Sequence, residues 1–218
     1  MRTRVLLVDD HVMMRDGLRA ILTSTDGFDV VGEAADGHEA VAASIELAPE
    51  VVVMDVGLPH MNGIEACRRI RKECPDTRVV ALSTHSDKRY VLNMIGAGAS
   101  GYVLKRAAGE DLIRAVEVVA RGEHYLSPQI TGVVFEPMAR VKKAKDEVAP
   151  TYHVLATRER EVLQLLAEGR TSKGIAAELG LSTKTIETHR RNISKKLGLR
   201  SIAELTKYAV REGMTSLD

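Results

Sequence analysis

Aromatic residues, cysteines and long apolar runs are all scarce in this sequence. Of its 218 residues 3% are aromatic, with no tryptophan, two cysteines and six prolines. No stretch approaches the roughly eighteen consecutive apolar residues of a membrane-spanning helix. The first short apolar stretch ends in Asp9 and Asp10, which a signal peptide would not do. We therefore expect a cytoplasmic protein with no membrane partner.

The two cysteines are predicted to be free thiols. Cys67 and Cys74 lie in a stretch with helical patterning, which would separate their Cα atoms by about 10 Å at 1.5 Å per residue. A disulfide needs less than about 7 Å. The pair also lacks the spacing of a metal site.

A strong excess of charge of one sign is absent as well, since the formal net charge is +1. The two ends of the chain nevertheless differ in sign. Residues 1–130 hold 15 Lys and Arg against 19 Asp and Glu, whereas residues 151–218 hold 12 against 8. The basic end is therefore the better candidate for binding nucleic acid.

One pattern occurs five times in the first 125 residues: a short Val/Ile/Leu-rich run, turn residues, and then an amphipathic stretch. Runs without alternation are typical of strands that are buried on both faces of a parallel sheet. The spacing between runs suits a strand followed by a crossover helix. We predict an α/β fold with a doubly wound, five-stranded parallel sheet, and strands at 4–8, 28–34, 51–55, 78–82 and 101–104.

This pattern stops after Ser127-Pro128, and helix signals return from Thr157. The intervening stretch has prolines, a lysine cluster and little apolar periodicity. The prediction is a first domain over 1–126, a linker over 127–150 that includes a helix as one alternative, and a small all-α domain of four short helices over 151–218.

Acidic, hydroxyl and lysine side chains lie where the predicted strands end. Asp9 and Asp10 follow the first strand, Asp55 ends the third, Ser83 follows the fourth and Lys105 the fifth. These ends meet at one rim of a parallel sheet. Clustered carboxylates repel one another unless a cation lies among them, and an oxygen-only site suits Mg²⁺. The alternative is that the aspartates are helix caps.

The segments that carry these residues resemble the receiver domain of bacterial two-component response regulators, which has a flavodoxin-like fold. They are 6–11, 53–63, 81–83 and 101–105. The resemblance implies that a sensor histidine kinase phosphorylates Asp55, and that Ser83 is the switch hydroxyl and Lys105 binds the phosphoryl oxygens. It also implies a Mg²⁺ site formed by Asp9, Asp10, Asp55 and the backbone carbonyl of Gly57. Tyr102 occupies the position of the family's switch aromatic residue.

The basic end contains a predicted helix over 183–197 with two different faces. Ile186, Ile193 and Leu197 share one side, whereas Lys184, Thr188, Arg191 and Lys195 cluster near the other. Cations mixed with hydrogen-bonding side chains suit the major groove of DNA. A solvated surface is the alternative, but the preceding helix and tight turn at Gly180 predict a helix-turn-helix.

The motifs of residues 157–197 resemble the LuxR-type DNA-binding domain, and a receiver followed by this module is the architecture of the NarL/FixJ class. The resemblance implies that Glu187, Thr188 and Arg191 face base edges, and that the DNA backbone is contacted by Lys173, Thr185, Arg190 and Lys195. Glu187 could instead pair with Arg191. The last predicted helix, with Ile202, Leu205 and Ala209 on one face, resembles the element with which the class dimerises on DNA.

The leading prediction is a phosphorylation-gated transcription factor that binds promoter DNA as a homodimer and is not a conventional enzyme. RNA polymerase is a further candidate partner. Phosphorylation would either free the DNA-reading helix or favour a dimer. One alternative is a phosphohydrolase with Asp55 as nucleophile, but position 57 is glycine where such enzymes have a second acid. Another is a regulator that binds DNA without phosphorylation.

Overall fold

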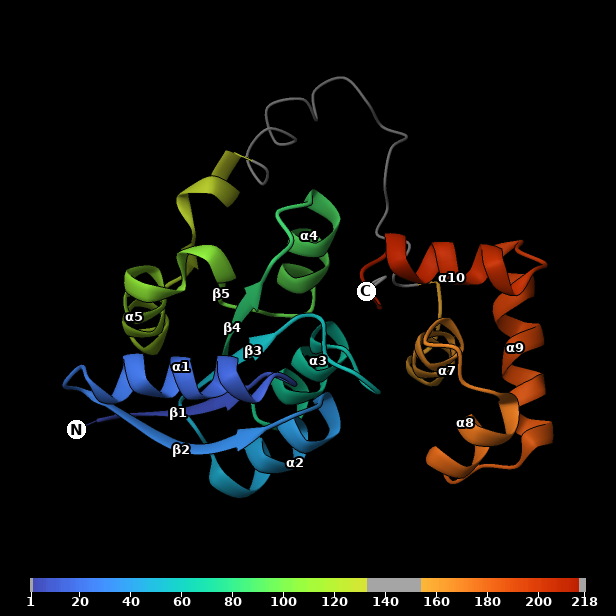
Figure 1. Ribbon diagram of the computed structural model, residues 1–218, viewed down its shortest axis with the longest axis horizontal. Helices are drawn as coiled ribbons and strands as arrows, with labels where there is room; N and C mark the ends of the chain where they lie inside the picture. Colours follow the sequence, from blue (N-terminus) through green and yellow to red (C-terminus); the bar gives the residue numbers. More distant parts are fainter. Residues whose placement is uncertain (1, 133–153, 216–218) are drawn as a thin grey trace. The chain divides into compact units, whose positions relative to one another are not determined.

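Five strands of a parallel sheet form at the apolar runs, in the first of two units into which the chain divides. The computed structural model describes residues 2–132 and 154–215 (Figure 1). The sheet order is β2-β1-β3-β4-β5-β6, so the strand order reverses next to β1, where such folds place their functional crevice. The predicted strands are β1 (Thr3–Val8), β2 (Phe28–Ala34), β3 (Val51–Asp55), β4 (Arg78–Ser83) and β5 (Gly101–Leu104).

Helices cover both faces of this sheet (Figure 1). One face packs against α1 (Val12–Thr23) and α5 (Ala108–Ala120), and the other against α2 (Gly37–Leu47), α3 (Gly63–Glu73) and α4 (Lys88–Gly96). A short 3₁₀ turn, η1 (Lys105–Ala107), follows β5. All residues of β3 are buried because this strand lies inside the sheet with helices on both sides. The doubly wound α/β prediction is confirmed.

The predicted number of five strands is wrong, because the sheet has six. The additional strand, β6 (Tyr125–Leu126), pairs in parallel with β5 through Gly101 and Tyr102. Two half-buried residues are too short to show a periodic pattern, so the sequence contained no strand signal here.

The chain continues to pack on the first unit beyond β6. Residues 128–132 are helical, and Ser127 and Ile130 are buried. The Ser127 amide donates to the Tyr102 carbonyl oxygen at 2.9 Å. The domain limits at residues 126 and 151 remain predictions, and most of the predicted linker lies outside the described residues.

The second unit contains the four predicted short helices: α7 (Thr157–Ala167), α8 (Ser172–Glu178), α9 (Thr183–Leu197) and α10 (Ile202–Arg211). Side chains of Thr171 and Ser182 cap α8 and α9 by accepting from backbone amides three residues later. Gly198 ends α9 in the left-handed conformation that glycine adopts without strain. No helix among the described residues is apolar over a length that could cross a bilayer.

Both cysteines are free thiols, as predicted. Cys67 is buried on α3, and its Sγ donates to the Ala97 carbonyl oxygen at 3.7 Å. Burial raises the pKa of this thiol to about 12. The reactive thiolate is therefore scarce at neutral pH, and Cys67 acts as a core residue.

Candidate functional site

Three charged side chains meet at the carboxyl end of the sheet. Asp9 follows β1, Asp55 is the last residue of β3, and Lys105 follows β5. The Lys105 Nζ atom lies 2.7 Å from Asp9 Oδ2 and 2.7 Å from Asp55 Oδ2. The predicted convergence of these distant positions at one rim is confirmed.

Burial and the charges of neighbouring groups both shift the pKa values in this cluster. Burial raises the pKa of Asp55, and the Asp9 charge adds to that, although the Lys105 ammonium acts in the opposite direction. For Lys105 burial alone would lower the pKa, but the Asp55 and Asp9 carboxylates raise it overall, which keeps the amine protonated. Two buried carboxylates therefore share one cation when both are ionised. One net negative charge then remains, and it favours the binding of a second cation.

The same rim carries a set of atoms that fits a hard divalent cation. The possible ligand atoms of Asp9, Asp10 and His11 all lie within 4.8 Å of one another. Mg²⁺ prefers carboxylate oxygens, which Asp9 and Asp10 supply. Asp55, predicted as a further ligand, is not part of this group and contacts Lys105 instead. Sequence reasoning gave His11 no part in this cluster, yet its Nδ1 lies 2.8 Å from Asp10 Oδ1. Its position next to two aspartates was the available signal.

Gly57 lies close to the Asp55 carboxylate. Its amide donates to Asp55 Oδ1 at 3.3 Å. A Cβ atom at position 57 would lie 3.9 Å from Asp55 Oδ2, with no closer contact. At Gly63, by contrast, a Cβ atom would come within 2.2 Å of the Asp55 carbonyl oxygen, so the start of α3 can pack behind Asp55 only with glycine there.

Helix capping does not explain the position of Asp55. The cap of α3 is Asn62, whose side chain accepts from the Glu65 amide at 2.9 Å. The N-cap of α1 is His11, without a side-chain capping bond. Asp9 accepts from the His11 amide at 2.9 Å, but its other oxygen faces Lys105. The capping alternative is therefore wrong for Asp55.

His85 connects the two predicted switch residues. The His85 amide donates to Ser83 Oγ at 3.0 Å, and the Tyr102 hydroxyl donates to the His85 carbonyl oxygen at 2.8 Å. Tyr102 is completely buried, and burial strongly raises the pKa of its hydroxyl. The His85 ring stacks on Tyr90, with ring centroids 4.2 Å apart. In this conformation the aromatic side chain at position 102 therefore already points inward.

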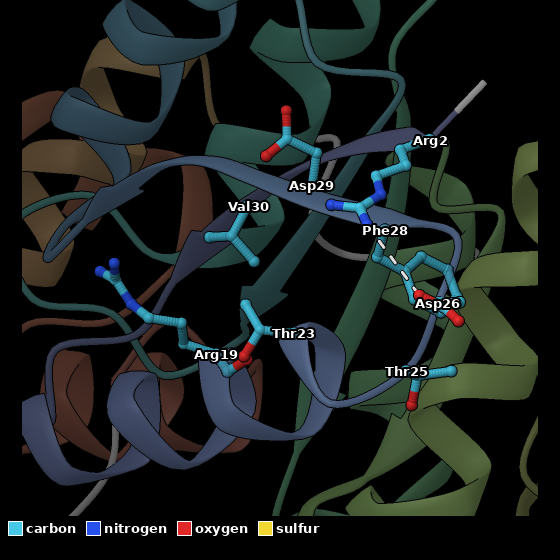
Figure 2. Close-up of a pocket in the computed structure, with 8 residues that line it drawn as sticks. All are labelled: Arg2, Arg19, Thr23, Thr25, Asp26, Phe28, Asp29 and Val30. Carbon is cyan, nitrogen blue, oxygen red and sulfur yellow. Dashed lines mark hydrogen bonds and ion pairs between the residues drawn. The ribbon is translucent and has the colours of Figure 1, made fainter.

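A small pocket lies at the opposite, amino-terminal edge of β1 and β2, and none of the predicted site residues lines it (Figure 2). Its volume is about 150 Å³. Arg2 and Asp26 form an exposed ion pair of 3.9 Å across it, and Arg19 lies at its edge (Figure 2). Its lining holds two arginines and two aspartates and therefore has no net charge.

In the second unit, α8 and α9 form the predicted helix-turn-helix. Ile186 and Ile193 are buried, which orients the opposite face of α9 outward. All eight predicted DNA contacts are at least partly accessible to solvent: Lys173, Lys184, Thr185, Glu187, Thr188, Arg190, Arg191 and Lys195. A face with five cations and one acid is electrostatically suited to a polyanion.

Glu187 pairs with Arg190 rather than with Arg191. Its Oε1 accepts from Arg190 Nη1 at 3.0 Å and from Ser172 Oγ at 2.5 Å. Arg190 also donates to Ser172 Oγ at 3.1 Å. Together these bonds connect the start of α8 to α9 and lower the pKa of Glu187. Sequence reasoning missed Ser172, which had only the ordinary features of a helix start.

The prediction that Ile202, Leu205 and Ala209 form a dimer surface is wrong for two of the three residues. Leu205 and Ala209 are 4% and 0% exposed, because α10 packs against α7 within the same unit. Ile202 is 54% exposed. Apolar spacing on a helix identifies a buried face but not whether the same chain covers it.

Family models match both ends of the chain. The response regulator receiver domain matches residues 5–117, and the luxR family of bacterial regulatory proteins matches residues 153–209. The transcriptional regulatory protein MctR of Rhizobium johnstonii is 37% identical over 215 residues, which cover 99% of this chain and 96% of that protein.

Solved structures agree with these matches. A LuxR-family two-component response regulator from an Aurantimonas species has a TM-score of 0.61 and 37% identity, covering 64% of this chain and 99% of its own. A structure of RcsB dimers bound to DNA has a TM-score of 0.59 and 25% identity, covering 97% and 99% of the two chains. The similarity therefore extends over both units.

Proposed function

The chain belongs to the bacterial two-component response regulators that join a receiver domain to a luxR-type DNA-binding domain, and we propose that its acceptor for the phosphoryl group is Asp55. The observation that carries this proposal is the contact of one lysine, Lys105, with both Asp9 and Asp55 at the carboxyl end of the sheet. These regulators are not classical enzymes, and the expected phosphodonor is the phosphohistidine of a sensor kinase.

In the proposed transfer, an Asp55 carboxylate oxygen forms a bond to phosphorus while the phosphorus–nitrogen bond of phosphohistidine breaks. The imidazole nitrogen leaves with the bonding electrons. Lys105, 2.7 Å from Asp55 Oδ2, is within reach of the oxygens that this group brings. Ser83 can turn its hydroxyl toward the same oxygens, which would change the bond that it accepts from His85.

Asp9, Asp10, Asp55 and the Gly57 carbonyl would hold Mg²⁺. When bound, the ion would neutralise charge on the phosphoryl oxygens during transfer. Buried Asp9 and Asp55 tolerate close approach only with cations among them, and Lys105 supplies one of these. The Ser83–His85–Tyr102 connection would then carry the change in charge at Asp55 toward β5.

The outward face of α9 would enter the major groove. Glu187, Thr188 and Arg191 are the proposed base-facing residues, and the other cations on this face would contact phosphates. The chain would bind as a homodimer on paired half-sites in the cytoplasm, as a single module buries little DNA surface. RNA polymerase is a candidate partner of the complex on a promoter.

The proposal is tested by incubating the full chain with Mg²⁺ and a small acyl phosphate. We expect the intact mass to increase by one phosphoryl group, and removal of Mg²⁺ by a chelator to prevent this. Hydroxylamine should release the group, because it cleaves acyl phosphates but not serine or threonine esters. A hydroxylamine-resistant product, or no gain in mass, would contradict the proposal. The phosphorylated chain should also bind promoter DNA more tightly than the unphosphorylated chain.

A side chain at position 57 should change the lifetime of the phosphoaspartate. Gly57→Asn would bring an amide close to Asp55, where it can orient a water molecule for attack. We expect dephosphorylation to become about two- to tenfold faster, the effect of one hydrogen bond of roughly 0.5–1.5 kcal/mol. Gly57→Ala is the control, since it fills space without a polar group. Equal half-lives of Gly57→Asn and the parent would refute the expectation.

A further inference from the structure

Arg15, near the start of α1, contacts the backbone of the loop that carries Asp9 and Asp10. Its Nη1 donates to the Asp9 carbonyl oxygen at 2.5 Å, and its Nε donates to Glu33 Oε2 at 3.1 Å. The Arg15 side chain is 14% exposed and that of Glu33 is 22% exposed. The planar guanidinium thus binds the end of β2 and the loop after β1 at the same time.

Both backbone polar groups of Asp9 are hydrogen-bonded. The Asp9 amide donates to the Ala34 carbonyl oxygen of β2 at 3.2 Å, and Arg15 holds the carbonyl on the other side of the same residue. That carbonyl belongs to the peptide group joining Asp9 to Asp10. Because the peptide group is planar, the orientation of this carbonyl fixes the positions of the Asp10 N and Cα atoms and so restricts the directions that the Asp10 side chain can take.

Glu33 anchors a second arginine, but that one does not reach the loop. Arg19 Nε donates to Glu33 Oε1 at 2.9 Å, and the Arg19 side chain is 51% exposed at the edge of the pocket in Figure 2. No contact between Arg19 and Asp9 is found among the described residues. The two arginines therefore share a partner and a charge, and differ in the bond to the Asp9 carbonyl.

We propose that Arg15 is a positioning residue for the divalent-cation site: anchored on Glu33, it holds the Asp9–Asp10 peptide so that the Asp10 carboxylate points toward the cation. This inference rests on the proposed function, because it takes Asp9 and Asp10 as cation ligands. Groups that orient metal ligands commonly contribute about 10- to 100-fold to metal affinity.

Charge and positioning predict opposite results for Arg15→Ala. Loss of a nearby positive charge would by itself strengthen the binding of a divalent cation. Loss of the bond to the Asp9 carbonyl would weaken it. Arg15→Lys preserves the charge but lacks the planar fork that reaches both Glu33 and the carbonyl. Charge alone therefore predicts unchanged affinity for this variant, whereas positioning predicts weaker affinity.

The experiment is a Mg²⁺ titration of the full chain without phosphodonor, followed by the backbone amide NMR shifts of His11 and Gly57. We expect Mg²⁺ affinity to fall by about tenfold in Arg15→Ala and measurably in Arg15→Lys. Arg19→Ala is the matched control and should remain within about twofold of the parent, since exposed ion pairs contribute little. Amide spectra without Mg²⁺ establish that each variant is folded.

The outcomes separate this inference from the proposed function. Parent-like or tighter Mg²⁺ binding in Arg15→Ala, or parent-like binding in a folded Arg15→Lys, would overturn the positioning role. Asp10→Asn should lose most of the Mg²⁺ affinity. Undiminished binding in Asp10→Asn would overturn the cation site itself, and with it this inference. Loss in Asp10→Asn together with no change at Arg15 would leave the proposed function intact and refute the inference alone.

Discussion

The Asp55→Asn variant is expected to gain no phosphoryl group under conditions in which the parent chain gains one. Asparagine has the same shape as aspartate, and its side-chain oxygen can still accept the Gly57 amide bond of 3.3 Å. It lacks the carboxylate that attacks phosphorus. The loss should therefore be complete and should occur without unfolding. Intact mass after incubation with Mg²⁺ and an acyl phosphate measures it.

Asp36→Asn is the matched control for this result. Asp36 caps α2 in the same unit by accepting from the Glu39 amide at 2.9 Å, a bond that asparagine also makes. Its labelling should equal that of the parent. Labelling of Asp55→Asn at the parental level would show that another residue is the acceptor. Loss of labelling in both variants would instead point to a general effect of removing an acid.

Two substitutions on the outward face of α9 should affect DNA binding in different ways. Arg191→Ala should lower the preference for the specific site by about 1–3 kcal/mol, because it removes a proposed contact to a base edge. Lys195→Ala should weaken binding to all sequences alike and reduce the slope of log affinity against log salt by about one, because it removes a phosphate contact. Both side chains are exposed, so neither change should unfold the domain.

The measurement is a salt titration of binding to a site selected from random DNA and to a scrambled duplex. Lys207→Ala is the control, since Lys207 is an exposed cation of the same unit on α10 rather than α9. We expect it to bind as the parent does. If Arg191→Ala weakens both duplexes equally, its base-reading role is wrong. If Lys207→Ala has the same effect as Lys195→Ala, net charge rather than the α9 face determines affinity.

Much of the receiver architecture could be predicted from the sequence because strands buried on both faces leave dense apolar runs. The ends of β2, β3 and β5 agree with the prediction to the residue. Asp9, Asp55 and Lys105 could be brought together for the same reason, since each follows or ends such a run. The two residues of β6 left no comparable pattern.

Other features depended on contacts that local patterns do not contain. The apolar spacing of Leu205 and Ala209 was correct for a buried face, but the covering element is α7 and not a second chain. The Arg15 side chain bonds to the backbone carbonyl oxygen of Asp9. Every residue has such an oxygen, so the residue types could not predict this bond. Glu187 had two arginines within helical reach, and Ser172 is a second partner of Arg190.

His85 contributes only backbone atoms to the hydrogen bonds that it makes with Ser83 and Tyr102. Any residue that adopts the same backbone conformation can therefore maintain them, and exchange of the imidazole need not disconnect the strand ends. Substitution of residue 85 can therefore change the ring that stacks on Tyr90 while the two backbone hydrogen bonds are preserved.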